Sequence, residues 1–125
     1  MNELIETIFK NFEVDKKTIP VSFLRYDGKS TTYVTYMQYD ADNSFSGDDE
    51  LLGYVDYYDF DVYSKGNYLN VVESIKEKLK ENGFMFQPSR SSMDMFEDDT
   101  GYFHKTLSFA IEREEKEKTD EIPSA

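Results

Sequence analysis

The sequence of 125 residues contains no cysteine, no tryptophan and only three prolines. Without cysteine, the chain has no disulfides, no thiolate metal ligands and no cysteine nucleophile. It also has no run of about eighteen apolar residues, so we expect no transmembrane helix. Its acidic, interrupted start does not resemble a signal peptide. We expect a chain made in a cytoplasm without membrane contact, although the lack of cysteine also suits a protein that later leaves the cell.

Positive charge is scarce as well. The chain has 14 Lys and Arg against 26 Asp and Glu, a net charge of −12. Such a balance argues against a protein that grips nucleic-acid phosphates. What the chain has in abundance is aromatic residues, with ten Tyr and ten Phe. Their large buried area allows a folded domain despite the charge, and the length predicts a single one.

Local patterns predict two helices and a mainly antiparallel sheet. The expected elements are a helix over 3–13, a hairpin of strands over 21–26 and 31–39, a polar loop over 40–50, a long strand over 51–63, a helix from a cap at Asn67 to Gly83, a short strand over 84–87, a polar loop over 89–100 and a last strand over 102–113. The buried stripe of the second helix is expected to consist of Leu69, Val72, Ile75 and Leu79, joined by Tyr68, Val71 and Phe84. Together they predict an α+β domain over 1–113, with both helices packed on one face of the sheet. The composition of 114–125 predicts a charged, flexible tail.

The long strand is expected to extend from the body of the domain. Thirteen residues at about 3.3 Å each span roughly 40 Å, whereas a domain of this size has a radius of gyration near 14 Å. The strand must therefore bend or project, and Gly53 is a plausible position for a bend. Alternation places Tyr58 and Phe60 on one face and Asp59 and Asp61 on the other.

Candidate motifs for chemistry do not reach a recognisable pattern. The acidic loop over 40–50 places neither Gly nor Glu at the positions that an EF-hand needs in either register. Asp56, Asp59 and Asp61 are a candidate carboxylate cluster, but no phosphate-binding loop or pair of histidines accompanies them. His104, the only histidine, is expected on the polar face of the last strand, and no Gly-x-Ser-x-Gly motif is present. We therefore expect no enzymatic activity, no metal and no cofactor.

Three apolar residues stand in an otherwise polar stretch. Met93, Met95 and Phe96 are interpreted either as a flap over the core or as a contact surface for a partner. The sequence leaves these two alternatives open.

Several runs together resemble one protein family. They are Asp61-Val62-Tyr63-Ser64-Lys65-Gly66-Asn67-Tyr68, then Asn82-Gly83-Phe84, and finally Glu97-Asp98-Asp99-Thr100-Gly101-Tyr102-Phe103-His104-Lys105. Over residues 4–113 the chain resembles the tail-completion or tail-terminator proteins of bacteriophages and prophages with long non-contractile tails. The resemblance implies a non-enzymatic structural protein that forms a hexameric ring in the virion, at the end of the tail next to the head, after assembly in the cytoplasm of the bacterial host. Such a ring caps the tail tube, ends its polymerisation and provides the docking surface for the head. The implied partners are further copies of the chain, the tail-tube protein and a head-completion or connector protein, with phage DNA as non-specific cargo.

Two sets of residues follow as candidate sites for this role. The first set is expected at the subunit or tube interface and comprises Asp40, Asp42, Phe45, Asp48, Asp49, Glu50, Met93, Met95 and Phe96. The second set, Asp56, Asp59 and Asp61, is expected to face the channel, where a negative wall would repel the phosphates of passing DNA.

Two other functions remain open from the sequence. An acidic protein of this size could mimic nucleic acid and inhibit a host protein by occupying its basic groove. A metal-dependent enzyme built on the Asp cluster is the less favoured possibility, because no convincing set of ligands accompanies the carboxylates.

Overall fold

The computed structural model describes residues 2–45 and 51–114, which form an α+β fold, as predicted. The helices are α1 (Asn2–Ile8) and α2 (Leu69–Glu81), with a short 3-10 helix at Pro88–Arg90. The strands are β1 (Glu13–Val14), β2 (Lys17–Thr18), β3 (Val21–Phe23), β4 (Thr32–Phe45), β5 (Leu51–Ser64), β6 (Met85–Phe86), β7 (Met95–Glu97) and β8 (Tyr102–Glu114). Glu114, the first residue of the predicted tail, belongs to β8, and 115–125 lie outside the described residues.

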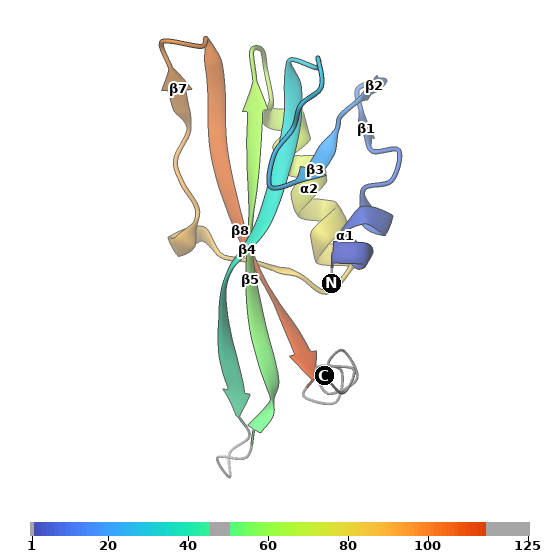
Figure 1. Cartoon of the computed structure of the whole chain (residues 1–125), viewed down its shortest axis with the longest axis vertical. Coiled ribbons are helices and arrows are strands. Elements are labelled where there is room, and N and C mark those ends of the chain that lie inside the picture. The colour runs from blue at the N-terminus through green and yellow to red at the C-terminus, as the bar shows by residue number, and fades with distance from the viewer. Residues whose placement is uncertain (1, 46–50, 115–125) are drawn as a thin grey trace.

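One mixed sheet organises the molecule. Its strand order is β3-β4-β5-β8-β6, and β7 pairs with the opposite end of β8 from β6. All neighbours are antiparallel except β3 and β4, while β1 and β2 form a separate small hairpin. In Figure 1 both helices lie beside the upper half of the sheet, and the lower half of β4 and β5 extends beyond them. The expected projection of the long strand is therefore present.

The core joins both helices to one face of the sheet. Phe60 of β5 is fully buried, and its ring lies 5.8 Å from that of Phe9 and 5.7 Å from that of Phe109. Ile75 and Leu79 of α2 belong to the same buried cluster. The alternation predicted for the long strand is confirmed, because its even-numbered residues from 56 to 64 are all buried and its odd-numbered neighbours are half-exposed.

The predicted hairpin over 21–39 is wrong. β3 is parallel to β4, with Val21 opposite Val34, so the chain must return to the starting end of β3 before β4 begins. Leu24 makes this possible by adopting a left-handed backbone conformation with φ 66° directly after the strand. Because β3 has only three residues, the segment 24–31 is long enough for a crossover that usually needs about a dozen.

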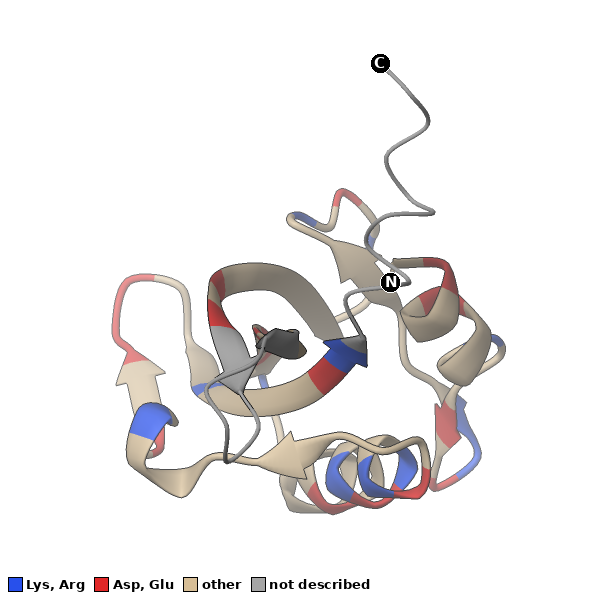
Figure 2. Ribbon diagram, turned by 90° about the horizontal axis from the view of Figure 1, so that it is seen from below, with Lys and Arg blue, Asp and Glu red and all other residues tan. Residues whose placement is uncertain are grey.

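The predicted loop over 40–50 is largely strand. β4 continues to Phe45 and pairs with β5 as far as Leu51, with register shifts at Gln38/Asp40 and at Ser44/Phe45. Gly53 pairs with Ser44, so it lies beside the second irregularity. Bulges of this kind bend a ribbon and increase its twist. Seen from below, the strands curl strongly instead of lying in a plane (Figure 2). No helix packs against this part of the ribbon, so its residues are polar. That polar composition is the reason why a loop was predicted.

The helices also differ from expectation in detail. The first ends at Ile8 instead of residue 13, and Asn11 follows with a φ of 57°. In α2 the predicted buried stripe is wrong at Leu69, which is 59% exposed, whereas Tyr68 and Val71, which were expected to join the stripe, are buried. The predicted cap at Asn67 is wrong by one residue, because the N-cap position of α2 is Tyr68, which makes no side-chain capping bond. The side chain of Asn67, one residue earlier, accepts a hydrogen bond of 3.0 Å from the Leu69 N–H.

Candidate functional site

The predicted site residues fall in two regions of the molecule. Asp40, Asp42 and the last residue of β4, Phe45, lie on the projecting ribbon, and the three channel candidates follow along β5, with Asp56 beyond the helices and Asp59 and Asp61 on either side of Phe60. Met93, Met95 and Phe96 lie at the far edge of the sheet, in and before β7. Asp48, Asp49 and Glu50 lie outside the described residues.

Asp56 does not face solvent, contrary to the expectation of a channel wall. It is 2% exposed, and Arg113 donates to both of its carboxylate oxygens, from Nε at 2.8 Å and from Nη2 at 3.1 Å. The amide of Gln38 adds a further hydrogen bond of 3.2 Å. A buried charge needs such partners. The carboxylate therefore holds β4, β5 and β8 together where the apolar core ends, and it has no surface to offer to DNA.

Asp59 lies on the opposite, helix-free face and is half-buried. Its Oδ1 is buried and, within the described part of the molecule, has no hydrogen-bond partner. Burial and the neighbouring charge of Asp61 raise the pKa of Asp59 to about 6, although a hydrogen bond with Ser108 opposes the rise. A carboxylate in this position is better suited to changing its charge near neutral pH than to forming a permanently negative wall.

Asp61 is engaged with β8 rather than open to solvent. It accepts hydrogen bonds from Thr106 Oγ1 and faces His104 Nε2 at 3.0 Å, while the other ring nitrogen of His104 lies 3.8 Å from Glu97. The His104 ring also stacks on Tyr63 with centroids 4.2 Å apart. Of the two imidazole nitrogens, Nε2 is within hydrogen-bond distance of a carboxylate, whereas Nδ1 lies beyond that distance from Glu97. The geometry describes a structural contact between strands.

The position of His104 on the polar face was predicted, but its hydrogen bond with Asp61 was not. The link depends on register, because β5 and β8 pair with Tyr63 opposite His104 and Asp61 opposite Thr106. The alternation of side chains along each strand predicts which residues share a face. The register between the two strands cannot be predicted from either strand alone.

The β7 edge is an exposed apolar surface, so these residues form no flap over the core. Met93 is 85% exposed, Met95 41% and Phe96 53%. The ring of Phe96 lies 4.9 Å from that of Phe103, so it rests on β8 and leaves its outer side open. Asp94 anchors the segment by accepting hydrogen bonds from Tyr68 and from Lys105, and the first of these contributes most to lowering the pKa of Asp94.

A second exposed apolar surface, which was not predicted, lies at the β3 edge. Phe23 is 46% exposed and Leu24 is 58% exposed. The following loop is held by Tyr26, whose hydroxyl accepts a hydrogen bond of 2.9 Å from the Ser30 N–H. A Cβ at Gly28 would lie 2.1 Å from that hydroxyl, so glycine is required for the loop to close in this way. This surface depends on the left-handed backbone conformation of Leu24, which the sequence pattern does not indicate.

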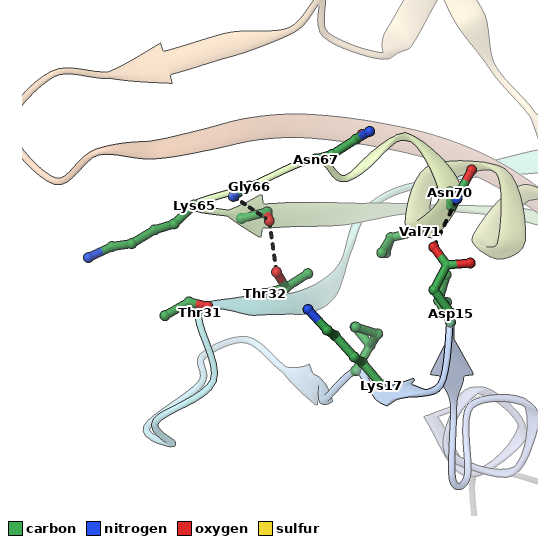
Figure 3. Close-up of a pocket in the computed structure, with 12 residues that line it drawn as sticks. Asp15, Lys17, Thr31, Thr32, Lys65, Gly66, Asn67, Asn70 and Val71 are labelled. Atoms are coloured by element: carbon green, nitrogen blue, oxygen red, sulfur yellow. Dashed lines mark hydrogen bonds between the residues drawn. The ribbon is translucent and has the colours of Figure 1, made fainter.

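A cavity of about 380 Å³ lies between the β1–β2 hairpin, the upper ends of β4 and β5, and α2 (Figure 3). Asn70 donates to Asp15 at 2.8 Å across one wall, and the Thr32 and Ser64 hydroxyls share a hydrogen bond of 2.7 Å at another. Figure 3 shows the amino group of Lys17 directed inwards and that of Lys65 directed away. One inward cation beside a carboxylate does not define a ligand class.

Other classes of site receive no support from the part of the chain that the structure covers. Among residues 2–45 and 51–114, no three His, Asp or Glu side chains gather closely enough to hold a metal ion. Neither described helix has the length and apolar character needed to cross a membrane. No protein-family model matches the chain, and no curated protein matches its sequence significantly. The candidate functional surfaces are therefore the projecting ribbon and the two apolar edges.

Proposed function

We propose that the chain is the subunit of a ring that caps a phage tail tube, ends its polymerisation and provides the docking surface for the head. The observation that carries the proposal is the pair of exposed apolar surfaces on opposite edges of one sheet, at β7 and at β3. Exposed apolar patches of this kind are typical of interaction sites. A subunit with two different sticky surfaces is suited to head-to-tail assembly, which closes into a ring when the rotation allows it. The proposed role involves no catalysis and no cofactor.

The projecting ribbon supports the same role. β4 and β5 have 14 residues each, which at about 3.3 Å per residue is roughly 45 Å, and their lower parts extend beyond the helices (Figure 1). An isolated domain gains little core from such an extension, whereas a ring subunit gains reach toward a neighbour or a tube. Asp40 and Asp42 are exposed on this ribbon, and Asp40 forms an ion pair of 3.4 Å with Arg90. We assign this surface to contact with the tail tube.

The alternative of a nucleic-acid mimic is less favoured by the described contacts. A mimic needs carboxylates presented to solvent at the spacing of phosphates. Asp56 is instead buried against Arg113, and Asp61 is bonded to Thr106 and His104. These two carboxylates of β5 are thus engaged within the subunit and are not presented as phosphate mimics. Proteins of this alternative class would be monomers or dimers that bind a host protein and ignore tail tubes.

Light scattering of the purified protein, alone and with its tail-tube protein, tests the proposal. We expect a hexameric ring, or a ring that forms only on tubes, and negative-stain electron microscopy should show it at one tube end. A monomer or dimer that is indifferent to tubes would contradict the proposal.

A pair of variants then tests the ribbon separately. Asp40→Asn with Asp42→Asn should weaken tube binding, whereas Glu73→Gln with Glu77→Gln removes the same charge from the exposed side of α2 and should not. Equal tube binding by both variants would remove the ribbon from the tube contact while leaving ring formation unaffected.

A further inference from the structure

The two apolar edges also differ in charge. The segment 93–100 of the β7 edge carries four carboxylates and no lysine or arginine: Asp94, Glu97, Asp98 and Asp99. The segment 23–31 of the β3 edge carries Arg25 and Lys29 against Asp27, a net charge of +1. The net charge of this segment is therefore opposite in sign to that of the whole chain, which is −12. Figure 2 shows the acidic loop that follows β7 in red at the left of the molecule.

Both edges have open backbone groups in addition to apolar side chains. Within the described part of the chain, β7 pairs only with β8, and β3 pairs only with β4. An edge strand presents unpaired N–H and C=O groups that can pair with another chain. The two edges lie on opposite sides of the sheet (Figure 1), so one copy cannot satisfy its own edges.

We propose that the β7 edge of one copy, defined by Met93, Met95, Phe96 and the acidic residues 97–99, docks on the β3 edge of the next copy, defined by Phe23, Leu24, Arg25 and Lys29. This inference rests on the proposed ring and names the surfaces that build it. Charge complementarity selects this pairing, since two β7 edges repel each other and a β7 edge attracts a β3 edge. Each contact leaves one free edge of each kind, so copies add until the ring closes.

Two edge variants test the pairing. Met93→Glu with Phe96→Glu disables the β7 edge, and Leu24→Asp with Lys29→Glu disables the β3 edge. The side chains of Met93, Phe96 and Leu24 are each more than half exposed, so their substitution should not disturb the core. Asp is also one of the residues that tolerate the left-handed backbone found at position 24. We expect each variant alone to be a monomer under the conditions in which the unaltered protein forms rings. A mixture of the two should form a dimer of twice the subunit mass and grow no further, because its remaining free edges are both acidic.

Controls separate this inference from the proposed function. Leu4→Glu alters an exposed apolar residue of α1 that is not among the residues defining either edge, and it should leave ring formation unchanged. Circular dichroism melting establishes that each variant folds. If the double variant unfolds, Met93→Glu alone replaces it, because Met93 is the most exposed large hydrophobic residue in the described part of the chain. Rings formed by both edge variants would overturn the pairing and leave the proposed function standing. So would a mixture that stays monomeric, whereas absence of rings from the unaltered protein would contradict the proposed function itself.

Discussion

The two halves of the long β-ribbon bury different chemistry on the same face. In the upper half, under the helices, that face carries Phe60 and Val62 packed into an aromatic core. In the lower half, beyond the helices, the next inward position along β5 after Tyr58 is Asp56, and its partner on β8 is Arg113. An apolar core needs a second layer to exclude water. Where that layer ends, the ribbon replaces apolar packing with a hydrogen-bonded ion pair.

This difference predicts how each half responds to substitution. The upper half should behave as a conventional core, in which stability follows the volume of apolar groups removed. The lower half should depend on keeping both members of a charged pair, because removing either one leaves the other charge buried without its counter-charge. The helix-free face of the ribbon should be less sensitive than either.

The largest effect is expected from Phe60→Ala in the upper half. The Phe60 side chain is fully buried and packs against the rings of Phe9, Tyr36 and Phe109. Its truncation should therefore lower the free energy of unfolding by about 4 kcal/mol. Urea denaturation followed by circular dichroism measures this change. Phe96→Ala removes the same atoms at a site that is 53% exposed and should cost less than about 1 kcal/mol. Similar losses for both variants would mean that the apolar core does not dominate the upper half.

The next effect is expected from Arg113→Ala in the lower half. The change leaves the Asp56 carboxylate buried with only Gln38 as a side-chain partner and should lower the free energy of unfolding by about 3 kcal/mol. The double variant Asp56→Ala/Arg113→Ala should be less destabilised than the single one, which a double-mutant cycle in urea would detect.

An exposed arginine provides the matched control for this pair. Arg25 forms an ion pair of 3.0 Å with Asp27, but the two side chains are 80% and 74% exposed. Because water screens such pairs, Arg25→Ala should change stability by less than about 0.5 kcal/mol. If Arg113→Ala were equally mild, the lower half would not depend on its ion pair.

The same difference between apolar packing and specific pairing explains which parts of the fold could be predicted from the sequence. Where apolar residues recur with one period, as in β5, β8 and α2, the sequence alone predicted the element and its buried face. It failed where pairing partners decide the outcome: β3 runs parallel to β4 because of the backbone at Leu24, and the polar residues 40–45 form strand because β5 lies beside them. Asp56 shared a face with apolar residues in the predicted strand, yet only the register with β8 reveals Arg113 as its partner.

The smallest effect is expected on the helix-free face, from Asp59→Asn. Because the pKa of Asp59 is raised from 3.8 to about 6, the folded state binds a proton more tightly than the unfolded state does. The contribution of Asp59 to the free energy of unfolding of the unaltered protein should therefore fall as pH rises from about 4 to about 6 and then level off. Asn carries no charge, so the variant should be more stable at pH 7 by on the order of 1 kcal/mol, a figure reduced for solvent screening at this half-buried site.

The pH profile distinguishes this cause from a simple gain in packing. Melting temperatures of both proteins at pH 4 and pH 7 should differ at pH 7 and converge at pH 4, where Asp59 is already neutral in the folded state. Asp99→Asn, at an exposed position beyond β7, should show no such pH-dependent difference. A constant offset between Asp59→Asn and the unaltered protein at both pH values would show that the charge of Asp59 is not what the helix-free face disfavours. The expected convergence would mean instead that this face holds a carboxylate at a cost, unlike the lower half of the ribbon, where Arg113 compensates the charge of Asp56.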